Sequence, residues 1–144
     1  MDDDLADLLH RVVFLLGEAA RRRADSAGGA GGLSYSQMRL LGTLEDIQPV
    51  TQHQLAQALS VSDPAISRAL RPLETAGLVQ VRQDPEHARR RLVTITEVGS
   101  KAFRDNGKPL YDELRAALLE AGFPYEQYLR DTARLARLLE PRDP

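Results

Sequence analysis

The sequence has no cysteine among its 144 residues. A disulfide, a thiolate metal ligand and a thiol redox switch are therefore all excluded. The sequence also lacks any run of about 18 uncharged apolar residues, the length that a membrane-spanning helix requires. Its start, Met1-Asp2-Asp3-Asp4, is acidic, whereas a secretory signal begins with basic residues. These absences predict a cytoplasmic protein without a membrane span.

Signatures of enzyme active sites are missing too. The glycine-rich stretch over residues 28–32 has no strand before it and no Lys-Ser/Thr after it, so it is not a phosphate-binding loop. No nucleophile is paired with a base, and no pair of catalytic carboxylates is recognisable. The histidines at positions 10, 53 and 87 are scattered, without a cysteine or a local cluster of further metal ligands. We therefore expect no catalysis, no cofactor and no metal site.

Residues 51–59 predict a short helix after an extended link at Pro49-Val50. The hydroxyl of Thr51 can cap the amide of Gln54, and the Gln54 side chain can return the bond in a capping box. An apolar stripe at helical spacing follows, formed by Leu55, Ala56 and Leu59. The next three residues, Ser60-Val61-Ser62, break this pattern.

A second helix is predicted directly after this break. Ser62 offers a capping hydroxyl, and Asp63-Pro64 places a carboxylate and a proline in the first turn, where both are favoured. Gly77 is expected to end the helix. The apolar stripe of this helix consists of Ile66, Ala69, Leu70 and Leu73. Two helices joined by so short a turn form a helix-turn-helix.

Two short runs rich in β-branched residues, 78–81 and 92–95, follow this unit and predict strands. The loop between them has Asp84-Pro85 at its turn and Arg89-Arg90-Arg91 on its return. A charged hairpin in this place forms the wing of a winged helix. The second helix is then expected to enter the DNA major groove, while the wing reaches towards an adjacent minor groove. The fold class predicted is mainly α with a small β-wing.

The distribution of charge favours this interpretation, although the net charge of −2 argues against a nucleic-acid partner. Residues 1–61 sum to −3 and residues 92–144 to −1. Residues 62–91 carry six arginines against four carboxylates, which gives +2. Positive charge is thus concentrated where phosphates would be contacted. A solvated charged face is the alternative explanation for this basic stretch.

Amphipathic helices are predicted before the helix-turn-helix. Residues 4–23 carry apolar side chains at three- and four-residue spacing and end in three arginines, which suit the negative end of a helix dipole. Residues 24–32 are rich in glycine and predict a flexible loop. A further helix should begin with Ser34 as its cap and Gln37 as the capping-box partner. We expect four of its residues to face the core: Met38, Leu41, Leu44 and Ile47.

Two more helices are predicted after the wing. The first is capped at Thr96, runs over residues 97–121 and is expected to bend near Pro109. The second begins at Phe123-Pro124. The winged helix is too small to cover the apolar faces of both terminal helices. We therefore predict a homodimer in which residues 4–23 and 97–140 are dimerisation helices.

The order and spacing of these motifs resemble the MarR family of transcription regulators over almost the whole chain. The segments that carry the resemblance are Leu33-Ser34-x-x-Gln37, Leu55-Ala56, Val61-Ser62-x-Pro64-x-Ile66-Ser67-Arg68, Leu73-Glu74-x-x-Gly77-Leu78-Val79, Asp84-Pro85 and Val93-x-Ile95-Thr96-x-x-Gly99. The resemblance implies a single domain over residues 1–144 with its winged helix-turn-helix at 33–96. It also implies a ligand-responsive repressor that binds a pseudo-palindromic operator. A metal-responsive regulator and a regulator without an effector are the alternatives.

By position, the resemblance places a set of side chains on the DNA. The recognition helix supplies Ser62, Ala65, Ser67, Arg68 and Arg71, and the wing supplies Arg89 and Arg90. A salt bridge to Asp63 or Glu74 is the alternative role for Arg68. The acidic-x-Arg signature of the family's wing falls on His87-Ala88-Arg89, so the arginine is present and its acidic neighbour is not. His87 could add a phosphate contact when it is protonated.

Two further expectations concern the effector and the shape of the recognition helix. The resemblance implies a small aromatic or phenolic effector in a crevice between the dimer helices and the reading domain. Its lining by position would be His10, Phe14, Tyr35 and Met38, with ordinary core packing as the alternative for Phe14 and Met38. Pro72 lies inside the recognition helix, which predicts a bend near Arg68–Arg71.

Overall fold

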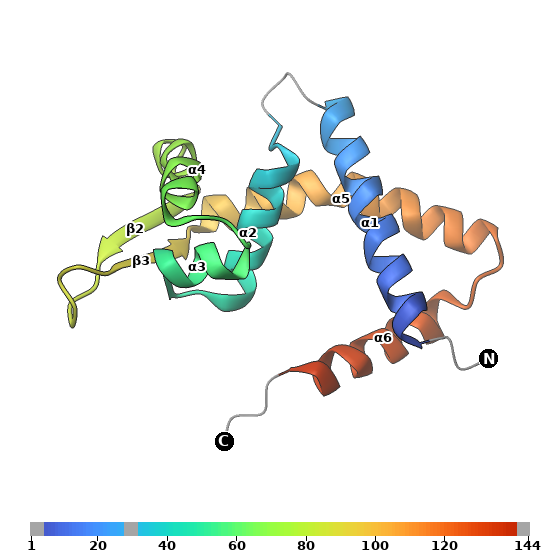
Figure 1. Cartoon of the computed structure of the whole chain (residues 1–144). Helices are drawn as coiled ribbons and strands as arrows, with labels where there is room; N and C mark the ends of the chain where they lie inside the picture. The colour runs from blue at the N-terminus through green and yellow to red at the C-terminus, as the bar shows by residue number, and fades with distance from the viewer. Residues whose placement is uncertain (1–4, 28–31, 141–144) are drawn as a thin grey trace. The chain divides into compact units, whose positions relative to one another are not determined.

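Six helices and three strands make up residues 5–27 and 32–140, the part of the chain that the computed structural model describes (Figure 1). The chain splits into two compact units within the fifth helix: the first ends at Lys108 and the second begins at Pro109. The predicted fold class, mainly α with a small β-wing, is confirmed. The elements are α1 (Leu5–Ala27), α2 (Tyr35–Ile47), β1 (Val50–Thr51), α3 (Gln52–Ala58), α4 (Asp63–Thr75), β2 (Val79–Gln83), β3 (Arg91–Ile95), α5 (Glu97–Glu120) and α6 (Tyr125–Leu139).

The predicted helix starts are confirmed by their hydrogen bonds. The hydroxyl of Ser34 accepts from the amide of Gln37, and the Gln37 side chain accepts from the amide of Ser34. The same reciprocal pair joins Thr51 and Gln54 at the start of α3. Ser62 caps α4 through its hydroxyl. Each cap satisfies backbone amides that the first turn of a helix leaves without a partner.

Helix α1 is longer than predicted. It continues to Ala27, so residues 24–27, which were predicted as the start of a loop, are helical. Two of these four residues are alanine, the strongest helix former, and the hydroxyl of Ser26 donates to the carbonyl of Arg22 at 2.7 Å. Residues 28–31 of the predicted loop lie outside the described residues.

The core of the first unit is formed by α2, α3, α4 and the sheet. Its most deeply buried side chains are Leu41, Leu44, Leu55, Ile66, Leu70, Leu73 and Val93. Two of the residues predicted to face it do not: Ile47 is 38% exposed, and Ala69 is exposed at the edge of its stripe. Residues spaced three apart in a helix are rotated by about 300°, which is about 60° less than a full turn. A series at this spacing therefore moves gradually around the helix and leaves the buried side. The stripe of α2 therefore centres on Leu40, Leu41 and Leu44, while Met38 is only half-buried.

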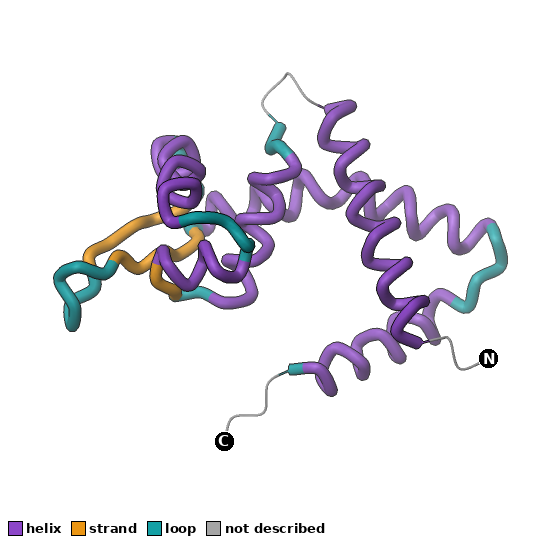
Figure 2. The backbone as a smooth tube through the Cα atoms, viewed as in Figure 1, coloured by secondary structure: helices purple, strands orange, loops and turns teal. Residues whose placement is uncertain are grey.

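The sheet has three antiparallel strands in the order β1-β3-β2 (Figure 2). The hairpin of β2 and β3 is the predicted wing, with Val81 opposite Val93. The segment at Pro49-Val50, predicted as an extended link, contributes to the sheet, because Val50 pairs with Val93 as part of strand β1. Strand β3 therefore has a partner on both sides, which fixes the base of the wing against the start of α3.

Two prolines lie inside helices. Helix α4 continues through Pro72 to Thr75, and α5 continues through Pro109 to Glu120, so neither proline ends its helix. Each ring removes the amide that would have bonded to the carbonyl four residues earlier, which belongs to Arg68 in α4. The bends expected near these prolines stay predictions.

The end of α4 is tied to the start of α5. Gly77 has a φ of 75°, its amide donates to the carbonyl of Glu74, and the amide of Leu78 donates to the carbonyl of Leu73. These two bonds are those of a Schellman motif, as expected for a glycine after a helix. The hydroxyl of Thr96 donates to the carbonyl of Gly77 and accepts from the amide of Gly99, so the predicted cap of α5 is confirmed.

Candidate nucleic-acid interface

Helix α4 has a buried side and a charged side. Ile66, Leu70 and Leu73 are 1–2% exposed and face the core. Successive residues of a helix are rotated by about 100°, so Arg68 and Arg71 lie on the side turned away from that core. Both are exposed. This is the arrangement that a recognition helix needs if its arginines are to reach phosphates or base edges.

The other three positions predicted on α4 differ in what they can offer. Ser62 is exposed, and its oxygen accepts a bond from the amide of Ala65 at 3.2 Å. Its hydroxyl proton is not used in that bond and can be donated to a phosphate. Ala65 and Ser67 are half-buried on the flanks of the charged side. They can contact only a surface that approaches α4 closely.

One of the two carboxylates proposed as alternative partners of Arg68 is engaged elsewhere. Asp63 pairs with Nδ1 of His53 at 2.9 Å. This contact crosses the turn of the helix-turn-helix, from α3 to the first residue of α4. This contact was not predicted from the sequence.

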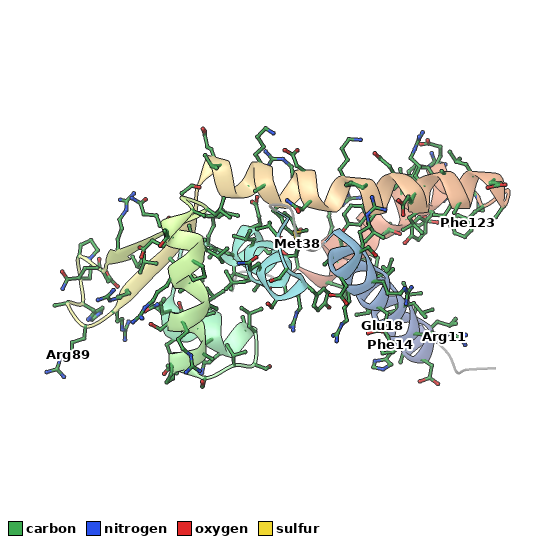
Figure 3. The ribbon with its side chains drawn as sticks, turned by 90° about the horizontal axis from the view of Figure 1, so that it is seen from above. Arg11, Phe14, Glu18, Met38, Arg89 and Phe123 are labelled. Carbon is green, nitrogen blue, oxygen red and sulfur yellow. The ribbon has the colours of Figure 1, made fainter. Side chains whose placement is uncertain are left out.

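The wing loop is held in shape by its own backbone. The amide of Asp84 donates to the carbonyl of Arg90 at 2.9 Å, and the amide of Arg90 donates to the carbonyl of His87 at 2.9 Å. The carboxylate of Asp84 accepts from the amide of Glu86, as in an Asx turn. Arg89 and Arg90 are exposed, and Figure 3 shows Arg89 at the outer end of the wing, directed away from the helices.

Two hollows lie beside α4. The larger, about 540 Å³, lies between α3, Asp63 and the return of the wing, and Arg89 and Arg90 border it. The smaller, about 340 Å³, lies between α4 and the sheet, and Ser67 and Arg71 border it. Of the residues predicted to contact DNA, Arg89 and Arg90 thus border one hollow, and Ser67 and Arg71 border the other.

Several polar residues that border these hollows were not among the contacts predicted from the sequence. Gln52 and Arg91 border both hollows, and His53 borders the larger one. Arg91 was visible in the sequence as the third arginine of its run, but it was assigned no contact. Gln52 and His53 carry no local signal, because their place beside the wing depends on the pairing of β1 with β3.

The four residues predicted to bind an effector lie on α1 and α2. His10 and Phe14 are exposed on α1, Phe14 to 60%. Tyr35 and Met38 are half-buried on α2, and the guanidinium of Arg21 lies 5.0 Å from the centre of the Tyr35 ring. Neither of the two hollows described above includes any of the four.

Two further surfaces of the described residues expose large apolar side chains to solvent. Helix α1 exposes a run of large apolar side chains, to between 38% and 70%: Leu5, Leu8, Leu9, Val12, Val13, Phe14, Leu15 and Leu16. In the second unit, α6 and the segment before it expose Phe123, Tyr128, Leu129, Leu138 and Leu139. Apolar patches of this kind mark surfaces that meet another molecule.

The described residues contain no candidate metal site and no helix that could span a membrane. No group of three or more histidine, aspartate or glutamate side chains there could hold a metal ion. None of the helices in residues 5–27 and 32–140 is both long enough and apolar enough to cross a bilayer.

Comparisons with known proteins point to one family. Residues 31–90 match the model of the MarR family. The uncharacterised HTH-type transcriptional regulator YwoH of Bacillus subtilis is 36% identical over 74 residues, which cover 51% of this chain and 53% of that protein. The chain thus spans about half the length of the curated relative it matches.

Solved structures share the fold at low sequence identity. Wild-type MarR from E. coli in its apo form superposes with a TM-score of 0.68 at 19% identity, covering 96% of this chain and 99% of that one. The complex of S. aureus MepR with DNA gives a TM-score of 0.56 at 23% identity, covering 96% and 98%. At these identities the likeness establishes the winged helix-turn-helix fold.

Proposed function

We propose that the chain is a DNA-binding transcriptional regulator of the MarR family, whose model its residues 31–90 match. The observation that carries the proposal is the exposed, arginine-bearing side of α4 next to an arginine-bearing wing. Arg68 and Arg71 would enter the major groove, and Arg89 would reach the minor groove beside it. Arg90, in the wing loop, and Arg91, the first residue of β3, would contact backbone phosphates.

The same proposal includes a homodimer. The apolar run on α1 is too large and too exposed for a surface that stays in water, and a second copy of the chain offers an identical surface. Two copies would present two recognition helices, which suits a pseudo-palindromic operator with half-sites one helical turn apart or a multiple of it. The complex of S. aureus MepR with DNA, whose fold this chain shares, supports DNA as the partner.

We further propose that the protein represses transcription and that a small aromatic or phenolic effector releases it from DNA. Of the predicted effector residues, Phe14 and Tyr35 offer aromatic surface, and Tyr35 also offers a hydroxyl. The cytoplasmic location expected from the sequence belongs to this same proposal.

The test is a mobility shift on the intergenic DNA beside the protein's own gene, run across a salt series. We expect specific binding whose affinity falls steeply with salt. Arg68→Ala and Arg71→Ala should each weaken this binding, whereas Arg104→Ala on α5, another exposed arginine, should not. Addition of candidate phenols should release the DNA if the effector part is right. Binding that is equal for operator and unrelated DNA would reject sequence-specific regulation.

A further inference from the structure

The side chains of His53 and Asp63 form a hydrogen-bonded pair on the surface that we assign to DNA. Nδ1 of His53 lies 2.9 Å from Oδ1 and 3.2 Å from Oδ2 of Asp63. The side chains are 65% and 63% exposed, so the pair stands in solvent. Asp63 is the first residue of α4, and the first residues of a recognition helix are those that approach the bases and their phosphates.

The pair borders the larger hollow, where it faces the wing. The charged side chains around this hollow are Asp63 from the start of α4 and Arg89, Arg90 and Arg91 from the wing, while His53 is the titratable group that α3 adds. Three positive charges and one negative charge give +2 when His53 is neutral and +3 when it is protonated. The hollow is thus suited to a phosphate oxyanion, and the carboxylate of Asp63 is the charge that opposes one.

Protonation of His53 changes the charge of this pair without changing its geometry. A neutral imidazole with its proton on Nδ1 donates to the carboxylate of Asp63, and the doubly protonated ring donates in the same way. The second proton enters at Nε2, on the other side of the ring. The pair therefore carries −1 with neutral His53 and 0 with protonated His53, with the same hydrogen bond in both states.

We propose that this hollow receives a backbone phosphate of operator DNA and that His53 makes the contact dependent on pH. The inference rests on the proposed function, which it deepens by naming a condition that regulates it. Protonated His53 cancels the charge of Asp63, whereas neutral His53 leaves that carboxylate facing the phosphate. Histidine changes charge between about pH 5 and 8, so operator affinity should fall as the pH rises through this range.

Coulomb's law sets the size of the expected effect. One unit charge about 6 Å from a phosphate, in surroundings between bulk water and half its dielectric constant, changes a binding constant by about three- to tenfold. The effect should shrink with added salt, because both groups are exposed.

The experiment measures operator affinity by fluorescence anisotropy at pH 5.5 and 8, at one fixed ionic strength. All proteins carry His87→Gln, which removes the histidine of the wing. The added variant is His53→Gln, because a glutamine amide can still donate to Asp63 but never becomes charged. We expect the parent to bind about three- to tenfold more weakly at pH 8. The His53→Gln protein should lose this difference and match the parent's affinity at pH 8.

A second variant tests the carboxylate. Asp63→Asn should tighten binding at pH 8 by a similar factor, since it removes the charge that opposes the phosphate. Equal pH dependence in the parent and in His53→Gln would overturn the inference, and so would an Asp63→Asn protein that binds no more tightly at pH 8. Either result leaves the proposed function standing if operator is bound. An absence of operator binding by every protein at both pH values would overturn the proposed function and this inference with it.

Discussion

The hydroxyl of Thr96 lies 2.6 Å from the carbonyl oxygen of Gly77 and donates to it. The same oxygen atom of Thr96 accepts the amide of Gly99 at 3.0 Å. One side chain therefore joins the end of the recognition helix to the start of α5. The position of α4 relative to the rest of the first unit depends on this link together with its buried core side chains and Leu78, which follows Gly77 and is also buried.

Replacing Thr96 should loosen this link. Thr96→Val keeps the shape of the side chain but removes both hydrogen bonds, and we expect the free energy of unfolding to fall by about 1–3 kcal/mol. Thr96→Ser keeps the hydroxyl and is the control. Urea denaturation of the three proteins measures the difference. Equal stability of the valine and serine variants would show that the hydroxyl does not contribute.

A methyl group at Gly99 should also destabilise the fold. A Cβ built there collides with the carbonyl of Leu78, which is backbone and cannot rotate away. We expect Gly99→Ala to cost about 1–3 kcal/mol, the usual range for overpacking. Gly122→Ala is a contrasting case: its Cβ would meet nothing, but its φ of 70° makes the backbone strained. Thermal unfolding that leaves Gly99→Ala as stable as the parent would contradict the packing that we describe.

Removing the outermost wing arginine should change the salt dependence of operator binding. Arg89→Ala deletes one cation from the interface, so the slope of log affinity against log salt should flatten by about one unit. Affinity at low salt should also fall. Arg104→Ala on α5 serves as the matched arginine outside the interface. A slope unchanged from the parent would remove Arg89 from the DNA contact.

The histidine of the wing makes a separate prediction. If His87 touches a phosphate when it is protonated, operator affinity should rise as the pH falls from 8 to 5.5, and His87→Ala should reduce that rise. The measurement needs a His53→Gln background so that the other histidine does not contribute. Identical pH profiles with and without His87 would reject this contact.

The apolar run of α1 predicts the oligomeric state. Leu8 and Val13 are 63% and 69% exposed, so the double variant Leu8→Glu/Val13→Glu should fold normally but dissociate into monomers. Arg11→Glu places a glutamate at a polar position of the same helix and is the control. Sedimentation velocity distinguishes the two forms. A parent protein that is already monomeric at micromolar concentration would contradict the dimer.

Features encoded by neighbouring residues were predictable from the sequence. The caps at Ser34, Thr51 and Ser62 and the stop at Gly77 are each specified within four residues, and each is present in the structure. Spacing alone was less reliable. Ile47 is exposed because residues three apart rotate steadily around a helix and leave the buried side.

Features that depend on distant residues were not predictable. Strand β1 exists because Val50 meets Val93, more than forty positions along the chain. The hydrogen bond between His53 and Asp63 forms only once α3 and α4 have packed, and no local sequence pattern indicates that the two residues are partners. The candidate DNA contacts were predicted by position from the resemblance to a known family, whereas the other residues that border the hollows required the fold.

The central position of β3 has a consequence for how the wing can move. Its backbone is bonded on both sides where Val93 lies between Val50 and Val81, whereas the pairing of β2 and β3 stops at Gln83 and Arg91. Local opening should therefore begin at the tip and stop at the three-stranded base, and amide hydrogens at the base should exchange with solvent last. The tip can then adapt to the width of a groove while the base keeps the register between wing and recognition helix.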